Sequence, residues 1–267
     1  MNSLNIFCVT DKPHKHLEAL NVNLVGVGKR QFNQKYITCL NGKNIQKKEK
    51  YYSELTFHFW FWKNKLKNYK KNDWIGFCQK RRFWTKNSLK VKNFKDLKKK
   101  IITKPKKEWS KYESIICKPI RVDNPKKMKL IKRGWRNILI DPSIVKQKKK
   151  QNIKLHFEMF HGYENLKKAL NVLPDKDKED FLEYISDNDM LSGHCIFMSN
   201  NPNLIKNFYT DLFDWLFKCE KLFGFDLNEY GTQRIYSFLT ERYTPFWFNK
   251  YAKVKYWPWV YCDITKF

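Results

Sequence analysis

No two of the seven cysteines lie close enough to form a C-x-x-C pair, which disfavours a zinc ribbon. Their number is odd, and most of them stand in apolar runs such as residues 6–9. Cysteines of this kind are typical of small buried hydrophobic side chains in a reducing compartment.

Long apolar runs are missing as well. No window offers the roughly 20 apolar residues that a membrane-spanning helix needs. The first apolar segment, residues 4–9, lacks the basic start and the long hydrophobic stretch of a signal peptide. Glycine and proline number nine each, which excludes collagen-like and linker-like architectures. We therefore expect a cytoplasmic protein, and peripheral contact with the inner face of a membrane stays open.

Acidic residues are scarce relative to basic ones. The chain has 54 Lys and Arg against 26 Asp and Glu, a net charge of +28. Such a charge predicts an anionic partner: nucleic acid, a phosphorylated metabolite or an acidic membrane surface. Aromatic residues make up 17%, which favours an aromatic core or a stacking site. An AT-rich genome would also enrich Lys, Phe and Tyr, so composition alone does not choose among these partners.

Buried apolar runs alternate with helical patterns along the chain. The expected strands are 4–10, 23–28, 74–78, 112–117 and 194–198, and the expected helices are 48–67, 155–170, 176–185, 203–222 and 232–241. This order predicts an α/β fold with a mostly parallel sheet and helices on both faces. We expect residues 1–267 to form a single domain that contains a Lys-rich variable segment, residues 85–150. The aromatic stretch 257–261 is expected to pack on that domain.

In open α/β sheets, ligands bind beyond the carboxyl ends of the strands. The residues that follow the first and third expected strands are therefore candidates for a binding site. They are Thr10, Asp11 and Lys12 after the first strand, and Gln79, Lys80, Arg81 and Arg82 after the third.

Several segments, in order along the chain, resemble one known family. Residues 6–12 look like its opening strand and loop. Residues 50–64 are similar to its signature helix, Tyr-x-Glu-Leu-Thr followed by Tyr-Trp-x-Trp-Lys-Asn. Residues 76–84 resemble its segment Gly-Leu-x-His-Tyr-Arg-Arg-Tyr-Phe, and residues 195–198, 215–217 and 240–242 resemble its C-terminal half. The family is the capsular-polysaccharide and O-antigen type of bacterial glycosyltransferases, long classed as a domain of unknown function.

The resemblance implies a GT-A-like (Rossmann-like) fold of the nucleotide-diphospho-sugar transferases. It implies a nucleotide-sugar donor, UDP-linked by our expectation, and a saccharide or lipid-linked saccharide acceptor in surface-polysaccharide synthesis. The chain departs from the family pattern at Asp11, where the family has His, and at Gln79-Lys80, where the family has His-Tyr. These departures favour a different sugar or acceptor, or an inactive relative that acts as a scaffold.

The predicted donor site combines cations with hydroxyl-binding groups. Arg81 and Arg82 carry guanidinium forks suited to phosphate oxygens, although two surface arginines would look the same in sequence. Glu54 is a candidate for ribose or sugar hydroxyls, and its alternative role is a helix-surface pair with Lys50. The remaining residues that we assign to donor or substrate binding are Tyr52, His194 and Arg242.

Acidic residues are the candidates for catalysis. Glycosyl transfer needs a carboxylate to hold or deprotonate the acceptor hydroxyl, and we assign this role to Asp187, Asp189 and Glu241. A structural salt bridge between Glu241 and Arg242 explains that pair equally well.

The D-x-D motif of metal-dependent transferases occurs twice, at 175–177 and 187–189. The first reads as a helix N-terminus, where acids favour the helix dipole. Asp187 and Asp189 are fallback ligands for Mn²⁺ or Mg²⁺. No cofactor is firmly predicted, because cations rather than aspartates follow the third strand.

A basic single-stranded nucleic-acid-binding protein is the alternative from another class. No known binding motif supports it, and the aromatic residues fall at helix-core spacing. We therefore expect no nucleic-acid partner.

Overall fold

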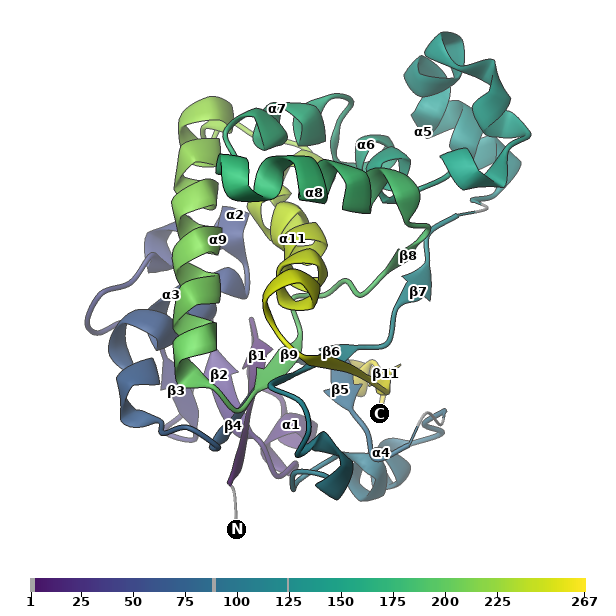
Figure 1. Cartoon of the computed structure of the whole chain (residues 1–267). Coiled ribbons are helices and arrows are strands. Elements are labelled where there is room, and N and C mark those ends of the chain that lie inside the picture. Colours follow the sequence, from purple (N-terminus) through teal and green to yellow (C-terminus); the bar gives the residue numbers. More distant parts are fainter. Residues whose placement is uncertain (1–2, 88–89, 124) are drawn as a thin grey trace. The chain divides into compact units, whose positions relative to one another are not determined.

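The computed structural model describes residues 3–87, 90–123 and 125–267 (Figure 1). Contacts within the chain divide it into two compact units. The first, here called the sheet unit, comprises Met1–Lys118, His194–Thr210 and Phe248–Phe267. The second, here called the helical unit, comprises Pro119–Gly193 and Asp211–Trp247. The division falls within two long helices, α9 (Pro202–Phe223) and α11 (Ile235–Tyr251).

The sheet unit is built on one mixed sheet, whose main path runs β10-β6-β9-β4-β1-β2-β3. The strands on this path are β1 (Leu4–Thr10), β2 (Asn23–Gly26), β3 (Tyr36–Thr38), β4 (Trp74–Gln79), β6 (Ser114–Cys117), β9 (Phe197–Ser199) and β10 (Val254–Trp257). β1 pairs in parallel with both β2 and β4. Their continuous apolar sequences fit this central position, since parallel strands are covered on both faces.

One strand breaks the parallel order. β9 runs antiparallel to β4 and to β6 on either side. This strand was expected over 194–198, and in the structure it is shifted and shortened to Phe197–Ser199. The shift has a local cause, because His194 and Cys195 adopt positive φ angles of 85° and 50°, which no strand accommodates.

Helices cover both faces of this sheet. The ring of Phe7 in β1 packs at 5.5 Å from Phe57 and 5.0 Å from Phe61, both on α3. The neighbours of Phe7 point to the opposite face, into a cluster that includes Leu17 of α1 and Leu97 of α4. The helices of this unit are α1 (Lys15–Glu18), α2 (Glu49–Tyr52), α3 (Leu55–Asn64) and α4 (Phe94–Lys100). Short 3-10 turns occupy Gln46–Lys48, Leu66–Asn68, Lys107–Trp109 and Ile264–Lys266.

The C-terminal aromatic stretch forms strands. β11 (Trp259–Tyr261) pairs antiparallel with β5 (Arg82–Trp84), which in turn pairs antiparallel with β4. The expected packing of residues 257–261 on the fold is confirmed, and it takes the form of added strands.

The helical unit contains the remaining elements. They are β7 (Ile120–Arg121), α5 (Lys127–Ile140), the 3-10 turns Pro142–Val145 and Lys148–Lys150, α6 (Ile153–His161), α7 (Asn165–Asn171), α8 (Asp175–Asp187), β8 (Met190–Leu191) and α10 (Tyr230–Gln233), with parts of α9 and α11. β7 and β8 form a small antiparallel ladder. Phe181 of α8 packs against Trp215 of α9 and Tyr243 of α11.

Three helices expected as continuous are broken. The helix expected over 48–67 splits into α2 and α3 because Ser53 adopts a φ of 52°. The helix expected over 155–170 splits into α6 and α7 at Gly162, whose φ is 97°. The helix expected over 232–241 divides at Arg234 into α10 and α11, and α11 continues through Pro245 to Tyr251. The predicted α/β class, with a mostly parallel sheet and helices on both faces, is confirmed.

Candidate functional site

The carboxyl ends of β1 and β4 lie at the same edge of the sheet. Val9 is paired in parallel register with Gln79, and the backbone N–H of Lys80 donates to the carbonyl of Val9 at 3.1 Å. The polar turns that begin at Thr10 and at Lys80 therefore lie side by side, as expected. The binding of a diphosphate between them stays a prediction.

The loop after β1 is shaped by Thr10. This residue is buried, and its hydroxyl donates to the carbonyl of Lys12 at 2.7 Å. The tight turn places Asp11 at the surface, where it forms an ion pair with Lys80. Burial by itself would raise the pKa of Asp11, but the hydrogen bond and charge of Lys80 lower it below its usual range. The departures from the family pattern at Asp11 and Lys80 are thus in contact with each other.

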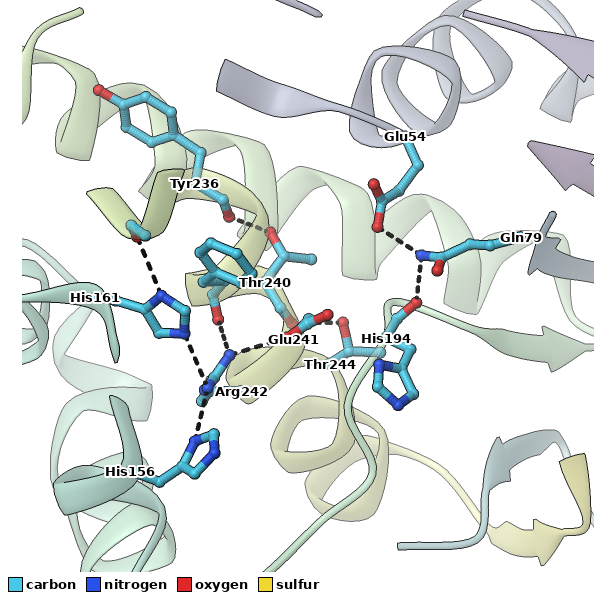
Figure 2. A network of polar contacts seen from close by, with 12 residues as sticks. Glu54, Gln79, His156, His161, His194, Tyr236, Thr240, Glu241, Arg242 and Thr244 are labelled. Carbon is cyan, nitrogen blue, oxygen red and sulfur yellow. Dashed lines mark hydrogen bonds and ion pairs between the residues drawn. The ribbon is translucent and has the colours of Figure 1, made fainter. Parts of the chain in front are cut away.

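Gln79 connects three elements at this edge (Figure 2). Its Nε2 donates to Oε1 of Glu54 at 2.5 Å and to the carbonyl of His194 at 2.8 Å. Its Oε1 accepts from a terminal nitrogen of Arg82 at 2.6 Å. Glu54 stands directly before α3, so the break at Ser53 is what aims its carboxylate at the strand end. The carboxylate of Glu54 thus contacts Gln79 at the strand end, and its predicted contact with ribose or sugar hydroxyls stays a prediction.

The two arginines have different surroundings. Nε of Arg81 lies 3.3 Å from Oδ2 of Asp263, near the C-terminus, and its side chain is 43% exposed. Arg82 begins β5, and its Nε, like that of Arg81, is buried without a hydrogen-bond partner among the described residues. A buried donor without a partner is costly, so Arg82 is suited to an added acceptor.

The other two predicted binding residues of this unit differ in accessibility. Tyr52 is fully buried, with no exposed surface. His194 is half-buried, and its ring packs edge-on against Trp259 at 4.8 Å. Both roles stay predictions, and the burial of Tyr52 means that its hydroxyl reaches a ligand only if neighbouring groups move.

The residues after β2 lie beside Thr10 at the same edge of the sheet and were not among the predicted site residues. Gly28 follows that strand with a φ of 88°, and its carbonyl accepts from Nε2 of Gln46 at 2.9 Å. A Cβ on Gly28 would lie 3.5 Å from the carboxylate of Glu49. The signal in the sequence was the pair of glycines at positions 26 and 28 directly after an apolar run.

A second polar cluster lies in the helical unit around Arg242 (Figure 2). The guanidinium is 1% exposed. One terminal nitrogen lies 3.1 Å from Nδ1 of His156 and 3.3 Å from Nε2 of His161. The other donates to Oε2 of Glu241 at 3.0 Å and to the carbonyl of Phe238 at 3.1 Å. A buried cation is thus held by one carboxylate and two imidazoles.

Both histidines of this cluster are neutral at physiological pH. Burial, with the charge of Arg242 added, lowers the pKa of His156 to about 4 and that of His161 to about 3. Neutral rings accept from the guanidinium, and His161 then donates through Nδ1 to the carbonyl of Gly231 at 3.1 Å. The sequence gives these histidines no metal-ligand spacing. The structure buries His161 and leaves His156 partly buried.

The predicted catalytic carboxylates are not grouped. Glu241 is partly buried beside Arg242, and a Cβ on Gly193 would lie 3.9 Å from its Oε2. Asp189 lies 3.0 Å from Arg121, which also forms a pair with Asp123 at 2.7 Å. Asp187 is exposed at the last position of α8.

These donors do not fit a divalent metal site. The D-x-D segment at 187–189 precedes β8 rather than following a strand, and Arg121 occupies the Asp189 carboxylate. The other D-x-D segment begins α8 as expected, and there Asp177 accepts a hydrogen bond from Tyr243 at 2.7 Å. Across the described ranges, no group of three His, Cys, Asp or Glu side chains is arranged to hold a metal ion.

A pocket of about 500 Å³ lies elsewhere in the helical unit. Its lining includes Asn137, Asp141, Lys150 and Glu158. Burial raises the pKa of Glu158, against a hydrogen bond from Asn137 that lowers it. None of the predicted donor or catalytic residues, in the part of the chain that the structure describes, belongs to this lining.

A family model described as "Domain of unknown function (DUF4422)" matches residues 5–253. The chain belongs to this family. The DUF4422 match extends through residues of both units, and whether residues 1–267 act as one domain stays a prediction.

One solved structure with the same fold is the apo structure of the WbbM bifunctional glycosyltransferase. It is 17% identical to this chain, with a TM-score of 0.68. The match covers 98% of this chain and 46% of the other, so this DUF4422 chain spans about half the length of WbbM. The likeness supports the predicted GT-A-like fold.

No curated protein matches the chain in sequence. Among the helices of the described residues, none is both long enough and apolar enough to cross a membrane.

Proposed function

We propose that this protein is a glycosyltransferase that moves a sugar from a nucleotide-sugar donor to a saccharide acceptor. The observation that carries the proposal is the cluster at the end of β4, where Gln79 joins the carboxylate of Glu54 to Arg82. This is the carboxyl edge of the parallel strands β1 and β4, and ligands bind at that edge in open α/β sheets. The resemblance of the sequence to polysaccharide-synthesising transferases and the shared fold with WbbM add support.

The donor diphosphate is assigned to the cations of this edge. Lys80, Arg81 and Arg82 supply positive charge, and each charge-assisted hydrogen bond to phosphate contributes about 1.5–3 kcal/mol. Fixed cations stabilise the charge that develops on the leaving diphosphate, the role that a metal takes in other transferases. Glu54 accepts from hydroxyls of the sugar or ribose, and the donor is UDP-linked in this proposal. The other donor contacts are assigned to Thr10, Asp11, Lys12, Tyr52, Gln79 and His194. Arg242, which is 1% exposed and held by Glu241, His156 and His161 in the helical unit, is not assigned to the donor.

In the transfer step, the bond between the anomeric carbon and the diphosphate oxygen breaks. The anomeric carbon bonds to an acceptor hydroxyl oxygen, and the hydroxyl proton passes to a carboxylate. All three candidates lie in the helical unit, and both Glu241 and Asp189 pair with an arginine at 3.0 Å. We assign this base to Glu241 first, because its side chain is 17% exposed, against 41% for Asp189, and Asp187 stands exposed at a helix end. The acceptor is a growing surface polysaccharide or a lipid-linked oligosaccharide, and the protein acts in the cytoplasm at the inner face of the membrane.

Thermal unfolding with a panel of nucleotides tests the donor site. A ligand at 100 times its Kd stabilises the native state by about 2.7 kcal/mol. We expect nucleoside diphosphates and their sugars to raise the melting temperature more than monophosphates, with and without Mn²⁺. A lack of any shift across UDP-, GDP-, CMP- and dTDP-linked sugars would count against a donor site. Binding without transfer to any acceptor would instead favour the inactive scaffold.

A further inference from the structure

Helix α5 carries two apolar faces, and only one of them is covered. Leu130 and Gly134 are buried, and Leu130 belongs to a small core with Met159 of α6. A Cβ on Gly134 would lie 3.4 Å from Met159, so the helix packs closely there. This buried face accounts for the attachment of α5 to its unit.

The second face is an exposed apolar stripe. Met128, Ile131, Trp135 and Leu139 recur at spacings of three, four and four residues, which aligns them along one side of a helix. Their exposed fractions are 79%, 54%, 51% and 71%, and Ile140 at the end of the helix is 71% exposed. Contiguous apolar surface of this kind marks an interaction site, because single exposed hydrophobic residues are usually scattered.

The surroundings of the stripe are strongly basic. Residues 126–150 hold ten Lys and Arg residues against one acidic residue, Asp141, a net charge of +9. Helical spacing places Lys132 and Arg136 along one border of the stripe and Lys127 along the other. Within the described part of the chain, no basic side chain of α5 forms an ion pair with an acid. Their charge is therefore available to a partner.

We propose that this exposed stripe of α5, here called the α5 stripe, docks on an acidic phospholipid bilayer. A helix with Trp, Leu and Ile on one side and Lys and Arg around it lies in the membrane interface, with the apolar side chains inserted among the acyl chains and the cations at the headgroups. Each Lys or Arg near an anionic surface contributes about 1 kcal/mol. The proposal deepens the membrane location proposed above, and it does not depend on the transfer activity.

Charge selects the bilayer over two other occupants. A second copy of the chain would bring a second +9 segment against the first, which like-charge repulsion disfavours. A nucleic acid would satisfy the cations, but it would leave the side chains of Met128, Ile131 and Leu139 without an apolar partner. A bilayer with acidic headgroups satisfies both the stripe and its border.

Co-sedimentation with vesicles tests the proposal. The vesicles are pure phosphatidylcholine, or phosphatidylcholine with about one third phosphatidylglycerol. The test variant is Ile131→Ser/Leu139→Ser, which removes two stripe side chains and keeps every charge. The control is Leu182→Ser/Leu222→Ser, which removes two leucines of the same unit that are each 44% exposed. We expect binding to acidic vesicles, a partition about tenfold weaker for the test variant, and no change for the control.

Several results would overturn the proposal. One is that the unaltered protein does not bind acidic vesicles. Another is that the test variant binds them equally well, which would mean that net charge alone attracts the protein. A dimer in size-exclusion chromatography that the test variant abolishes would assign the stripe to a second copy. Oligonucleotide binding that falls with the test variant, without vesicle binding, would assign it to nucleic acid. The vesicle assay contains no sugar donor, so its result does not depend on sugar transfer. A protein that binds vesicles but transfers no sugar in a separate assay would refute the proposed function and leave the docking proposal standing.

Discussion

Nε2 of Gln79 donates to Oε1 of Glu54 across 2.5 Å, which joins the end of β4 to the start of α3. The orientation of the Gln79 amide is determined by its partners, since its nitrogen meets two acceptors and its oxygen meets the donor of Arg82. These contacts hold the carboxylate of Glu54 at the end of β4, although Glu54 directly precedes the apolar helix α3. This arrangement distinguishes it from an ordinary surface glutamate.

Glu54→Gln keeps the shape of the side chain and removes its charge. We expect kcat/KM for the nucleotide sugar to fall about 10- to 100-fold, because an amide is a weaker acceptor for hydroxyl groups than a carboxylate. The melting temperature should change by no more than a few degrees. Glu108→Gln, an exposed glutamate of the same unit, is the matched control. Unchanged turnover and donor affinity in the Glu54 variant would show that Glu54 has only a structural role.

The cations at the end of β4 predict activity without a divalent metal. We expect transfer to continue in excess EDTA. Arg82→Lys and Arg81→Lys keep the charge but lose the fork, and each should weaken diphosphate affinity about tenfold. Arg133→Lys in the helical unit is the control. Complete loss of activity in EDTA that Mn²⁺ restores would refute this prediction and return Asp187 and Asp189 to first place as ligands.

Comparison of three carboxylates tests the assignment of the base. We expect Glu241→Gln to lower kcat by 100-fold or more, on the order of a lost general base. Asp189→Asn should lose only its surface pair with Arg121, about 0–1 kcal/mol of folding stability, with transfer largely kept. Asp187→Asn should behave as the unaltered protein does. Rates at saturating donor and acceptor give the comparison, and a larger loss in either aspartate variant would reassign the base.

The histidines beside Arg242 predict acid-sensitive folding. Their pKa values, about 4 for His156 and about 3 for His161, lie below the ordinary 6.5, so the unfolded chain binds more protons as pH falls through 6.5. The native state is therefore fully stabilised above pH 6.5 and loses stability as pH falls towards 4. At pH 5.5 each histidine costs about 1 kcal/mol.

Chemical unfolding between pH 7.5 and 5 measures this loss. His156→Asn keeps an acceptor for Arg242 and removes the titrating group, so its stability should depend less on pH. His161 and His58, each with a pKa lowered to about 3, still titrate in that variant, so a shallower but not a flat profile is expected. The same slope in both proteins would contradict the burial of His156 as a neutral ring.

Much of the sheet could be predicted from the sequence. The apolar runs of β1 and β4 fixed both strands to within a residue, and the apolar spacing of α9 fixed that helix, because burial on two faces or one leaves a periodic pattern. The shared edge of the Thr10 and Lys80 turns followed from the parallel pairing alone. Breaks that depend on single φ angles were missed. Ser53 is not a residue type that marks a positive φ, and Gly162, which is, stands inside an apolar helical pattern.

The sequence by itself determined the fold class, the family and the edge of the sheet at which polar groups gather. Only the tertiary structure decided which of them meet. Arg242 lies 86 residues from His156, and Asp11 lies 69 from Lys80, distances over which hydrophobic periodicity carries no information. Periodicity reports whether a face is buried, whereas the partner of a buried charge depends on how separate elements pack. Within the Lys-rich segment the sequence predicted no individual helix, and only the packing of α5 on α6 separates its covered face from the exposed one.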